Sequence, residues 1–413
     1  MRKGFFAWAA IFFCVVSAAG CTGSAQPEGE HAAKKDKKTV ELTVWGAEED
    51  EELLGQLIRS FEQQYQGEAD FRITFEAHSE SQCKDNLLTD LEAGADVFTF
   101  ADDQLNALAA AGALEPVENS GEITGANLSS TVEAASVAGT LYAYPLTADN
   151  GYFLYFNRRY FSDEDVETLD RILKIAAENE KLFVMDWTSA WYVYAFFGNT
   201  GLEVGLNPDG ITNFCTWNGQ EGEIRGVDVA QAMLDVAAST GFASRTDVEF
   251  MEGVRAGSVI AGVSGVWNAV ALEEIWGEDL GAAKLPTYTC RGRQIQMASF
   301  SGCKLVGANA YSKNYEWAIR LAEWLTKEQS QELRFAMRGQ GPSNSQAAMS
   351  LAVQGSPAIA ALLAQSEFSD LQRVGGHFWD PVAVFAENMA AGNPTGEDLQ
   401  KQLDKMTEDI IAR

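Results

Sequence analysis

Carboxylates stand at three points of the chain, each just after a segment that can form a strand. Glu48 and Glu49 follow the first segment, Asp102 and Asp103 follow the second, and Asp149 follows residues 144–148. Ionised carboxylates accept hydrogen bonds from hydroxyl groups, which is what recognition of a neutral sugar requires. Paired carboxylates can also act as the acid and base of a glycoside hydrolase, a reaction that needs the two groups to flank one bond.

The first two of these acidic positions also have a purely structural interpretation. Negative charge at Glu48 and Glu49 would stabilise the N-terminus of the helix that follows them, and we weigh this equally with ligand contact. Asp102 and Asp103 could serve as an N-cap pair for the next helix.

Aromatic side chains lie near the predicted ligand positions. Phe100 directly precedes the second acidic pair, and residues 186–192, DWTSAWY, carry Trp187, Trp191 and Tyr192. An aromatic ring offers an apolar face to the C–H side of a pyranose. We expect at least one of these three residues to face a cleft, the alternative being that the whole cluster is buried in the core.

The sequence lacks the motifs that metal binding, histidine-dependent catalysis or ATP binding would require. The chain has three histidines, and neither CxxC nor HExxH spacing occurs, which argues against a transition-metal site or a histidine-driven triad. No GxxxxGK[ST] motif is present, so no ATP site is expected, and no cofactor is predicted. Cys290 and Cys303 could close a short disulfide loop, with unpaired buried thiols as the alternative.

The elements that position these residues alternate between strand and helix. Apolar residues alternate at 40–44, 71–75 and 95–100, and helical spacing fills the intervals 51–65 and 83–93 and continues at 103–111. This order predicts an open, mostly parallel α/β sheet, which binds ligands at the carboxyl ends of its strands. Further helices are predicted at 314–326 and 398–412, with Trp317 and Trp324 expected in the core.

Composition limits the classes of protein and partner. The 413 residues are 46% hydrophobic and include 23 Phe and 10 Trp, which is ample for a packed core in two lobes. The formal net charge is −29, and it becomes −31 if Arg2 and Lys3 are removed with residues 1–20. Such an acidic surface repels nucleic acid and anionic lipid, and a monomer is the default expectation.

The N-terminus resembles the export signal of a bacterial lipoprotein. Arg2 and Lys3 precede an apolar stretch, residues 5–19, that is too short for a permanent membrane span. Small residues lead to Cys21, as in the lipobox, although Ala18 stands where that pattern prefers Leu. The resemblance implies cleavage of residues 1–20, a lipid on Cys21, and a polar tether over 21–38. An ordinary secretory signal is the alternative.

From residue 38 onward the chain resembles the solute-binding proteins of bacterial ABC importers, particularly the maltose/maltodextrin-binding branch. The matching segments are LTVWGAEEDEELLGQLIRSFEQQY, ADVFTFADDQLNALAAAGALEPV, GTLYAYPLTADNGYFLYFNRRYF, GSVIAGVSGVWN and FSGCKLVGANAYSKNYEWAIRLAEWLT. All five occur in the order in which the family has them.

The resemblance implies a periplasmic-binding-protein-like α/β fold of type II, with two lobes that close on a ligand about a hinge. It places lobe 1 at 38–147 plus 303–350, and lobe 2 at 150–300 plus 358–413. Chain crossings are expected near 147–151, 300–302 and 341–344. The site residues it implies come from both lobes: Glu48, Glu49, Phe100, Asp103, Asp149, Trp187, Trp191, Trp267 and Trp379.

Departures from the family pattern bear on the ligand. Phe100 replaces a Trp platform, Gln104 replaces an Arg, and Ala383 stands where another Arg contributes to the sugar site. These departures leave the particular sugar open. The number of candidate aromatic platforms favours a sugar, with an oligosaccharide such as a maltodextrin as the example.

The function implied is capture of this sugar without catalysis and its delivery to a membrane permease. The protein would be exported and held by its lipid on the outer face of the cell membrane or in a periplasm. The alternatives are a secreted glycoside hydrolase and the same importer role with a polyamine or peptide.

Overall fold

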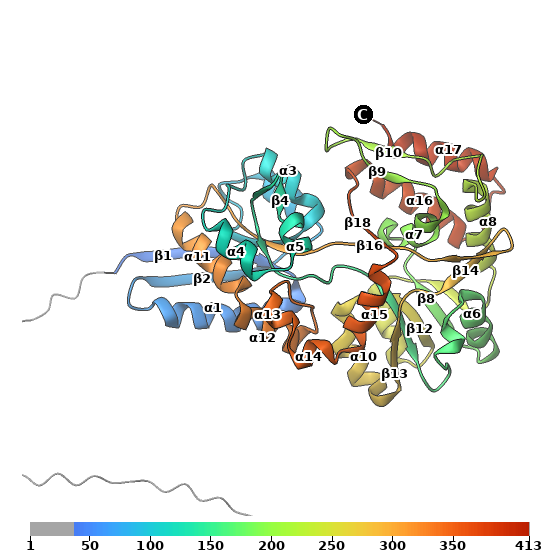
Figure 1. Ribbon diagram of the computed structural model, residues 1–413, viewed down its shortest axis with the longest axis horizontal. Coiled ribbons are helices and arrows are strands. Elements are labelled where there is room, and N and C mark those ends of the chain that lie inside the picture. Colours follow the sequence, from blue (N-terminus) through green and yellow to red (C-terminus); the bar gives the residue numbers. More distant parts are fainter. Residues whose placement is uncertain (1–36, 413) are drawn as a thin grey trace, which may run out of the picture. The chain divides into compact units, whose positions relative to one another are not determined.

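Two five-stranded sheets, each with helices packed against it, form the two lobes of the protein (Figure 1). The computed structural model describes residues 37–412. From Lys38 onward the chain belongs to one unit. The two-lobed α/β class expected from the sequence is therefore the class observed.

The first lobe contains the sheet ordered β2-β1-β3-β17-β6. Its strands are β1 (Thr39–Gly46), β2 (Asp70–Ala77), β3 (Val97–Ala101), β6 (Tyr144–Pro145) and β17 (Lys304–Ala308). Both β2 and β3 run parallel to β1, which confirms the predicted parallel start of the sheet. By contrast β17, from late in the chain, runs antiparallel between β3 and β6.

Helices cover both faces of this sheet. They are α1 (Glu51–Tyr65), α2 (Cys83–Thr89), α3 (Leu105–Ala110), α4 (Ser120–Ala126), α5 (Ser129–Ala134), α11 (Tyr315–Thr326), α12 (Glu328–Arg338) and α13 (Ser345–Ala348). On one face α1 and α11 bury residues such as Leu57, Phe61 and Leu321 against β1 and β17. Each such side chain contributes about 1.5–3 kcal/mol by its burial.

Two of the helix predictions for this lobe can be compared directly with the structure. The helix predicted at 314–326 is α11, whose Trp317 and Trp324 are half-buried against the core. The helix predicted to reach residue 93 ends at Thr89, because Asp90 has extended backbone and its Oδ1 accepts hydrogen bonds from the N–H groups of Glu92 and Ala93, each at 3.1 Å. A side chain that competes for backbone donors in this way ends a helix.

The second lobe contains the sheet ordered β11-β8-β12-β7-β13. Its strands are β7 (Phe153–Asn157), β8 (Leu182–Met185), β11 (Phe242–Ser244), β12 (Val259–Ser264) and β13 (Leu280–Ala283). The strands β11, β8 and β12 are parallel, whereas β7 runs antiparallel to both of its neighbours. Two short hairpins, β9 (Val204–Leu206) with β10 (Asn213–Cys215) and β14 (Thr287–Cys290) with β15 (Arg293–Gln296), flank the sheet.

Helices of the second lobe pack on both faces of its sheet. They are α6 (Leu169–Glu178), α7 (Ala190–Phe197), α8 (Gly226–Ala237), α9 (Asp247–Arg255), α10 (Ala269–Trp276), α15 (Pro357–Ser366), α16 (Trp379–Ala390) and α17 (Leu399–Ile410). The larger core lies under α6, α7, α8, α16 and α17, and a second core lies under α9, α10 and α15. The helix predicted at 398–412 is α17.

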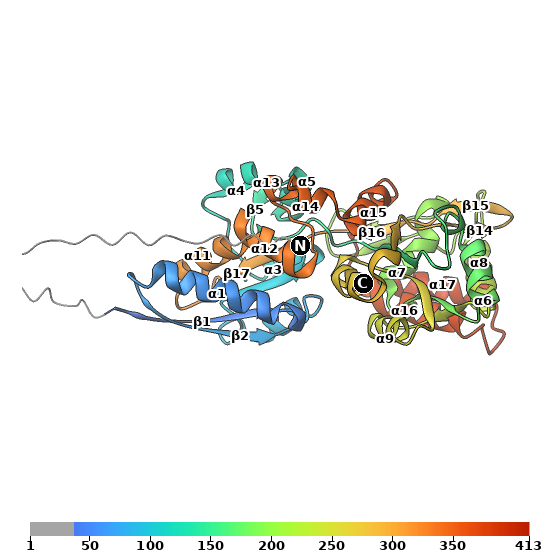
Figure 2. The same cartoon turned by 90° about the horizontal axis from the view of Figure 1, so that it is seen from below.

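Three chain segments meet between the lobes. Residues 147–151, 300–302 and 341–342 are joined by backbone hydrogen bonds, from Asn150 to Gly302 at 3.2 Å and from Ala148 to Gly341 at 2.9 Å. Beside them β16 (Ser299–Ser301) pairs with β18 (Ser369–Leu371), and both views show β16 in the connection between the lobes (Figures 1 and 2). Short extended crossings of this kind are typical hinge elements.

The structure decides between the two interpretations of the cysteines. Cys83, Cys215, Cys290 and Cys303 are all free thiols, so the possible Cys290–Cys303 disulfide is wrong. Cys290 ends one strand of a hairpin in the second lobe, whereas Cys303 enters the first lobe beside Asp102. Burial raises the pKa of both thiols, that of Cys290 to about 11, which keeps them protonated.

The predicted signal, Cys21 and nearly all of the tether lie outside the described residues. Over residues 37–412, no helix has the length and apolar character that a membrane span requires.

Candidate functional site

The principal cavity lies where strand ends of both lobes converge. It has a volume of about 820 Å³, in the upper part of the range of roughly 300–1,000 Å³ typical of small-molecule sites. Its walls come from segments that follow β1, β2 and β3 in the first lobe and β8, β11 and β12 in the second, together with the start of α16. Strand carboxyl ends are the positions where open α/β sheets bind ligands.

The segment after β1 carries three acidic residues with different environments. Glu48 and Glu49 line the cavity and are exposed. Asp50 is buried beneath them, where Arg334 bonds to its Oδ2 and Arg338 Nε donates to its Oδ1 at 2.9 Å. Burial alone would raise the pKa of Asp50, but Arg334 and the neighbouring cations hold it below its usual value.

The segment after β2 contributes an ion pair to the cavity wall. Lys304 Nζ lies 2.6 Å from Glu80 Oε2, and each side chain is only 12% exposed. The other oxygen, Glu80 Oε1, is buried without a hydrogen-bond partner. Burial would lower the pKa of Lys304, but Glu80, Asp50 and Asp149 outweigh it and raise that pKa. Lys304 therefore remains charged in the cavity wall.

Gln104 links the segment after β2 to the segment after β3. Its Nε2 donates to the carbonyl oxygens of Glu80 and Ser81, at 2.8 and 3.2 Å, and its Oε1 accepts from the backbone N–H of Lys84 at 2.8 Å. A side-chain amide that satisfies three backbone groups holds two loops in one arrangement. Glu80 and Asp103 are thereby held on neighbouring walls of the same cavity.

Asp102 and Asp103 form a carboxyl pair with unusual protonation. Burial raises the pKa of Asp102 to about 6, against a hydrogen bond from the Cys303 N–H at 3.0 Å and the charge of Arg373. Burial and the Asp102 charge together raise the pKa of Asp103 to about 7, while a hydrogen bond from Gln372 opposes this. Asp103 lines the cavity and its Oδ1 has no partner.

The second lobe presents aromatic rings to the cavity. Trp191 at the start of α7, Trp267 after β12 and Trp379 at the start of α16 all line it, and the ring centroids of Trp191 and Trp267 are 5.8 Å apart. Gly265 makes room for this arrangement, because a Cβ atom there would stand 2.0 Å from the Trp267 ring.

Asp247 fixes the orientation of the Trp267 indole. Its Oδ2 accepts from Trp267 Nε1 at 3.2 Å, and its Oδ1 accepts from Ser264 Oγ at 2.8 Å. Asn268 Nδ2 donates to both carboxylate oxygens at 2.9 Å. All three donors lie at or just after the carboxyl end of β12, so these bonds hold the Trp267 ring in one orientation at that strand end.

Six of the predicted ligand residues line the cavity: Glu48, Glu49, Asp103, Trp191, Trp267 and Trp379. Contrary to prediction, the other three do not. Phe100 is fully buried beside Phe98 in the core of the first lobe, because β3 is buried on both faces of its sheet. Trp187 is fully buried against Phe196 and Phe242.

Asp149 is the third predicted ligand residue that does not line the cavity. It is 2% exposed and accepts a hydrogen bond from the Gly341 N–H, so it joins two of the crossing segments. Burial raises its pKa to about 6.

Several cavity residues were missed by sequence reasoning: His78, Glu80, Asp247, Asn268, Lys304, Arg338, Gln340 and Gln372. Glu80 and Asp247 follow strand ends, a signal that could have indicated them. Lys304 lies at the start of a strand far along the chain, and only the pairing of β17 with β3 brings it here.

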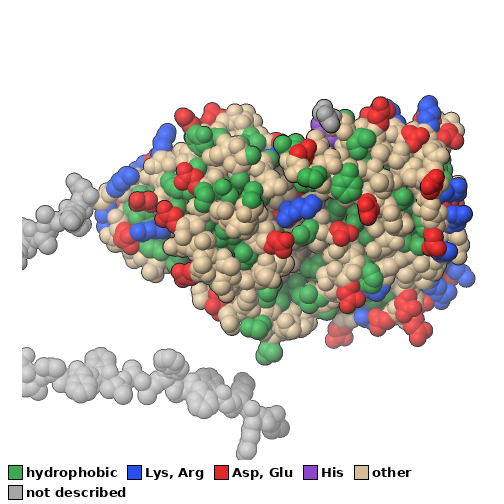
Figure 3. All heavy atoms as spheres, turned by 45° about the horizontal axis from the view of Figure 1, so that its top comes forward, with side chains coloured by type: hydrophobic (Ala, Val, Ile, Leu, Met, Phe, Trp, Pro, Cys, Tyr) green, Lys and Arg blue, Asp and Glu red, His purple; other side chains and the backbone are tan. Residues whose placement is uncertain are grey.

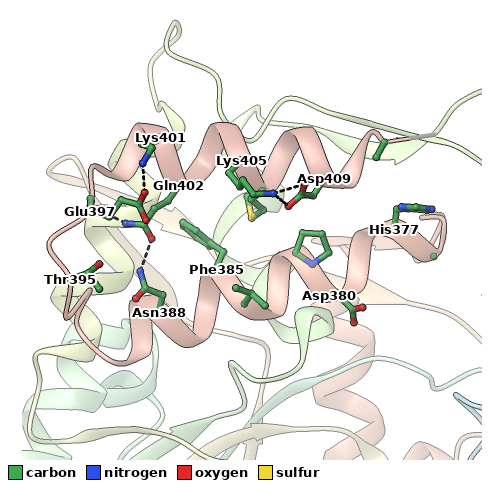
Figure 4. Close-up of a pocket in the computed structure, with 15 residues that line it drawn as sticks. His377, Asp380, Phe385, Asn388, Thr395, Glu397, Lys401, Gln402, Lys405 and Asp409 are labelled. Atoms are coloured by element: carbon green, nitrogen blue, oxygen red, sulfur yellow. Dashed lines mark hydrogen bonds and ion pairs between the residues drawn. The ribbon is translucent and has the colours of Figure 1, made fainter.

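A second hollow, of about 1,060 Å³, lies between α16 and α17 on the second lobe (Figure 4). Lys401 and Lys405 on its rim are paired with Glu397 and Asp409, and these pairs are solvent-exposed. It contains no strand end and none of the predicted ligand residues. We therefore place the candidate site in the cavity between the lobes.

Neither the surface charge nor a metal-binding cluster indicates another site among the described residues. The face shown in Figure 3 carries acidic side chains over both lobes, with Lys and Arg in small separate groups. Within residues 37–412, no group of three or more His, Cys, Asp or Glu side chains is arranged to hold a metal ion.

Comparison with known proteins identifies the class. Residues 56–361 match the family of bacterial extracellular solute-binding proteins, so the chain belongs to that family. The chain is 24% identical over 397 residues to the galactooligosaccharide-binding protein of Bacillus subtilis (strain 168), covering 92% of this chain and 91% of the relative.

Solved structures share the whole fold. One solved with acarbose has a TM-score of 0.80 and 26% identity, covering 90% of this chain and 99% of its own. The maltose-maltodextrin binding protein of Alicyclobacillus acidocaldarius has a TM-score of 0.74 and 20% identity, covering 90% and 100%. The expected resemblance to the maltodextrin-binding branch is thus confirmed for the fold.

Proposed function

We propose that this protein captures an oligosaccharide between its lobes for an ABC importer. The observation that carries the proposal is the composition of the cavity, with three tryptophans on one side and hydroxyl acceptors on the other. Tryptophan faces bind the apolar faces of sugar rings, and carboxylates accept hydrogen bonds from sugar hydroxyls. The names of the relatives, which include a galactooligosaccharide-binding and a maltodextrin-binding protein, support the same ligand class.

Capture would work because the closed arrangement of the lobes binds the sugar more tightly than the open arrangement does. A sugar that contacts only one lobe gains the contacts of the other when the lobes rotate about the three crossing segments. The closed arrangement is favoured only by the additional binding energy that it provides. Closure also excludes water, which strengthens the hydrogen bonds to Glu80 and Asp103.

The cellular part of the proposal extends beyond the described residues. We infer that the chain is exported, that a lipid on Cys21 anchors it to a membrane, and that the loaded monomer docks on a separate permease. The lobe limits at 38–147 plus 303–350 and 150–300 plus 358–413 belong to the same proposal, and the two sheets and their crossings support them.

The cavity is proposed to bind sugar without cleaving it. One of its carboxylates, Glu80, is held by Lys304 through one oxygen, an arrangement that suits a fixed hydrogen-bond acceptor. Membership of a family of binding proteins supports the same conclusion.

A thermal-shift screen against mono- and oligosaccharides, with polyamines and short peptides as controls, tests the proposal. A ligand that binds only the native state stabilises it by RT ln(1 + [L]/Kd), so a true ligand raises Tm in a concentration-dependent way. We expect a shift with one oligosaccharide series, and recovery of that sugar intact. A shift with amines or peptides alone would overturn the sugar class, and recovery of cleaved sugar would identify a hydrolase.

A further inference from the structure

We infer that the segment His78–Ser81 forms a sugar-ring subsite on the first lobe, with His78 as its stacking face and Glu80 as its hydroxyl acceptor. This inference rests on the proposed function and deepens it, because it requires a ligand with at least one ring beyond those held by the tryptophans. Among the described residues that line the cavity, His78 carries the only aromatic ring from the first lobe, since Phe100 lies in the core.

The first step is the fixed orientation of the His78 ring. Its centroid lies 3.9 Å from the Trp45 ring, with an interplanar angle of 15°, so the two rings are stacked. Glu76 lies beside both rings. Its Oε2 accepts a hydrogen bond from Trp45 Nε1 at 2.9 Å and lies 3.9 Å from His78 Nε2. Asn86 Nδ2 approaches His78 Nδ1 at 3.3 Å. A ring held by three neighbours loses little rotamer freedom when a ligand packs on it.

The second step is the accessible surface of this ring. Trp45 is buried and covers one side of the imidazole, whereas the His78 side chain is 27% exposed and lines the cavity. A planar ring whose one face is backed and whose remaining surface borders the cavity can pack on the C–H face of a pyranose.

The third step is the polar group two residues along. Glu80 is held by Lys304 through one oxygen, while its other oxygen is buried at the cavity wall without a partner. A buried acceptor without a partner is unfavourable, and a ligand hydroxyl would supply the missing hydrogen bond. Gln104 fixes the backbone of this segment, so His78 and Glu80 are presented together.

The test compares four variants by calorimetric titration with the oligosaccharide that stabilises the wild type most. We expect His78→Ala to weaken binding about five- to tenfold, and His78→Phe to restore most of the affinity. Glu80→Gln should weaken binding about tenfold or more. His377→Ala is the matched control, because His377 is exposed at the α16–α17 hollow and should leave the affinity unchanged.

Two further measurements separate the possible failures. The chain has three histidines, so an imidazole proton resonance that disappears in His78→Ala is assigned to His78, and saturating sugar should shift it. If the sugar binds, Trp379→Ala weakens it and His78→Ala does not, the subsite is refuted while the proposed function stands. If no sugar binds the wild type, the proposed function fails and the subsite fails with it.

Discussion

The two walls of the cavity differ in how they are built. The wall on the first lobe contains charges held in buried pairs, Asp50 with Arg334 and Glu80 with Lys304. The wall on the second lobe contains three tryptophans, of which Trp267 is oriented by the carboxylate of Asp247. A buried charge must be paired to be tolerated. An aromatic face, by contrast, contributes to sugar affinity through the apolar surface that it buries. Removing a partner from a buried pair should therefore chiefly alter stability, and changing Asp103 should alter its pH dependence, whereas removing a tryptophan should chiefly alter affinity.

The largest expected effect is on the stability of the first lobe. Asp50→Ala leaves Arg334 buried without its partner carboxylate, which should lower the free energy of unfolding by about 3–5 kcal/mol. Denaturant unfolding of the ligand-free protein measures this change. Glu397→Ala, which removes an exposed pair with Lys401 on α17, is the control and should cost less than about 1 kcal/mol. Equal losses in the two variants would contradict the comparison.

The next effect is on affinity at the second lobe. Trp379→Ala removes one aromatic face from the cavity and should weaken sugar binding by about 2 kcal/mol, or roughly 30-fold. Titration calorimetry measures the affinity, and thermal unfolding of the free protein measures the accompanying loss of stability. Trp276→Ala, a buried tryptophan outside the cavity, should show the reverse pattern. A variant of Trp379 that loses stability but keeps its affinity would show that this ring is only a core residue.

A smaller effect concerns pH. The pKa of Asp103 is about 7 in the folded protein, above its ordinary value, so its contribution to stability is fully present below about pH 4 and is lost as pH rises through 7. Asp103→Asn should remove this dependence, about 2–3 kcal/mol between pH 5 and 8. Unfolding of both proteins at several pH values tests this. Parallel curves for wild type and variant would show that Asp103 does not titrate in this interval.

The smallest effect comes from a single methyl group. Gly265→Ala places a Cβ atom against the Trp267 ring, which must turn away from its bond to Asp247. We expect sugar affinity to fall by about 0.5–1 kcal/mol, within the measured range for aromatic contacts. Gly376→Ala is the control, because a Cβ atom there meets nothing within 4 Å. The interpretation fails if both glycine variants bind sugar equally well.

Sequence reasoning succeeded where the signal is local. Alternation at 40–44 and 71–75 and the helical stripe of α1 predicted the parallel start of the first sheet, and Glu48, Glu49 and Asp103 follow its strand ends and line the cavity. The three tryptophans of the cavity were predicted from the family resemblance instead. Sequence reasoning failed where the outcome depends on the direction of a side chain within an element. Phe100 is on a strand that is buried on both faces, so its neighbours in sequence do not indicate whether its ring reaches the cavity.

Long-range pairing was also beyond the sequence. Lys304 enters the cavity only because β17 joins the sheet beside β3, and Asp149 becomes a hinge residue only because Gly341 returns to meet it. Neither contact has a local pattern. The hinge segments themselves were predicted approximately, but from the family resemblance and not from a local pattern.

The position of β17 also constrains how the chain folds. The strands β3 and β17 are hydrogen-bonded neighbours, yet about two hundred residues separate them, and the whole second sheet lies in that interval. Contacts of such high sequence separation form late, because loop closure must precede them. The sheet of the second lobe can therefore assemble while β3 still has an unpaired edge. Until β17 arrives, that edge is open to pairing with other chains, which makes completion of the first lobe the aggregation-sensitive step of folding.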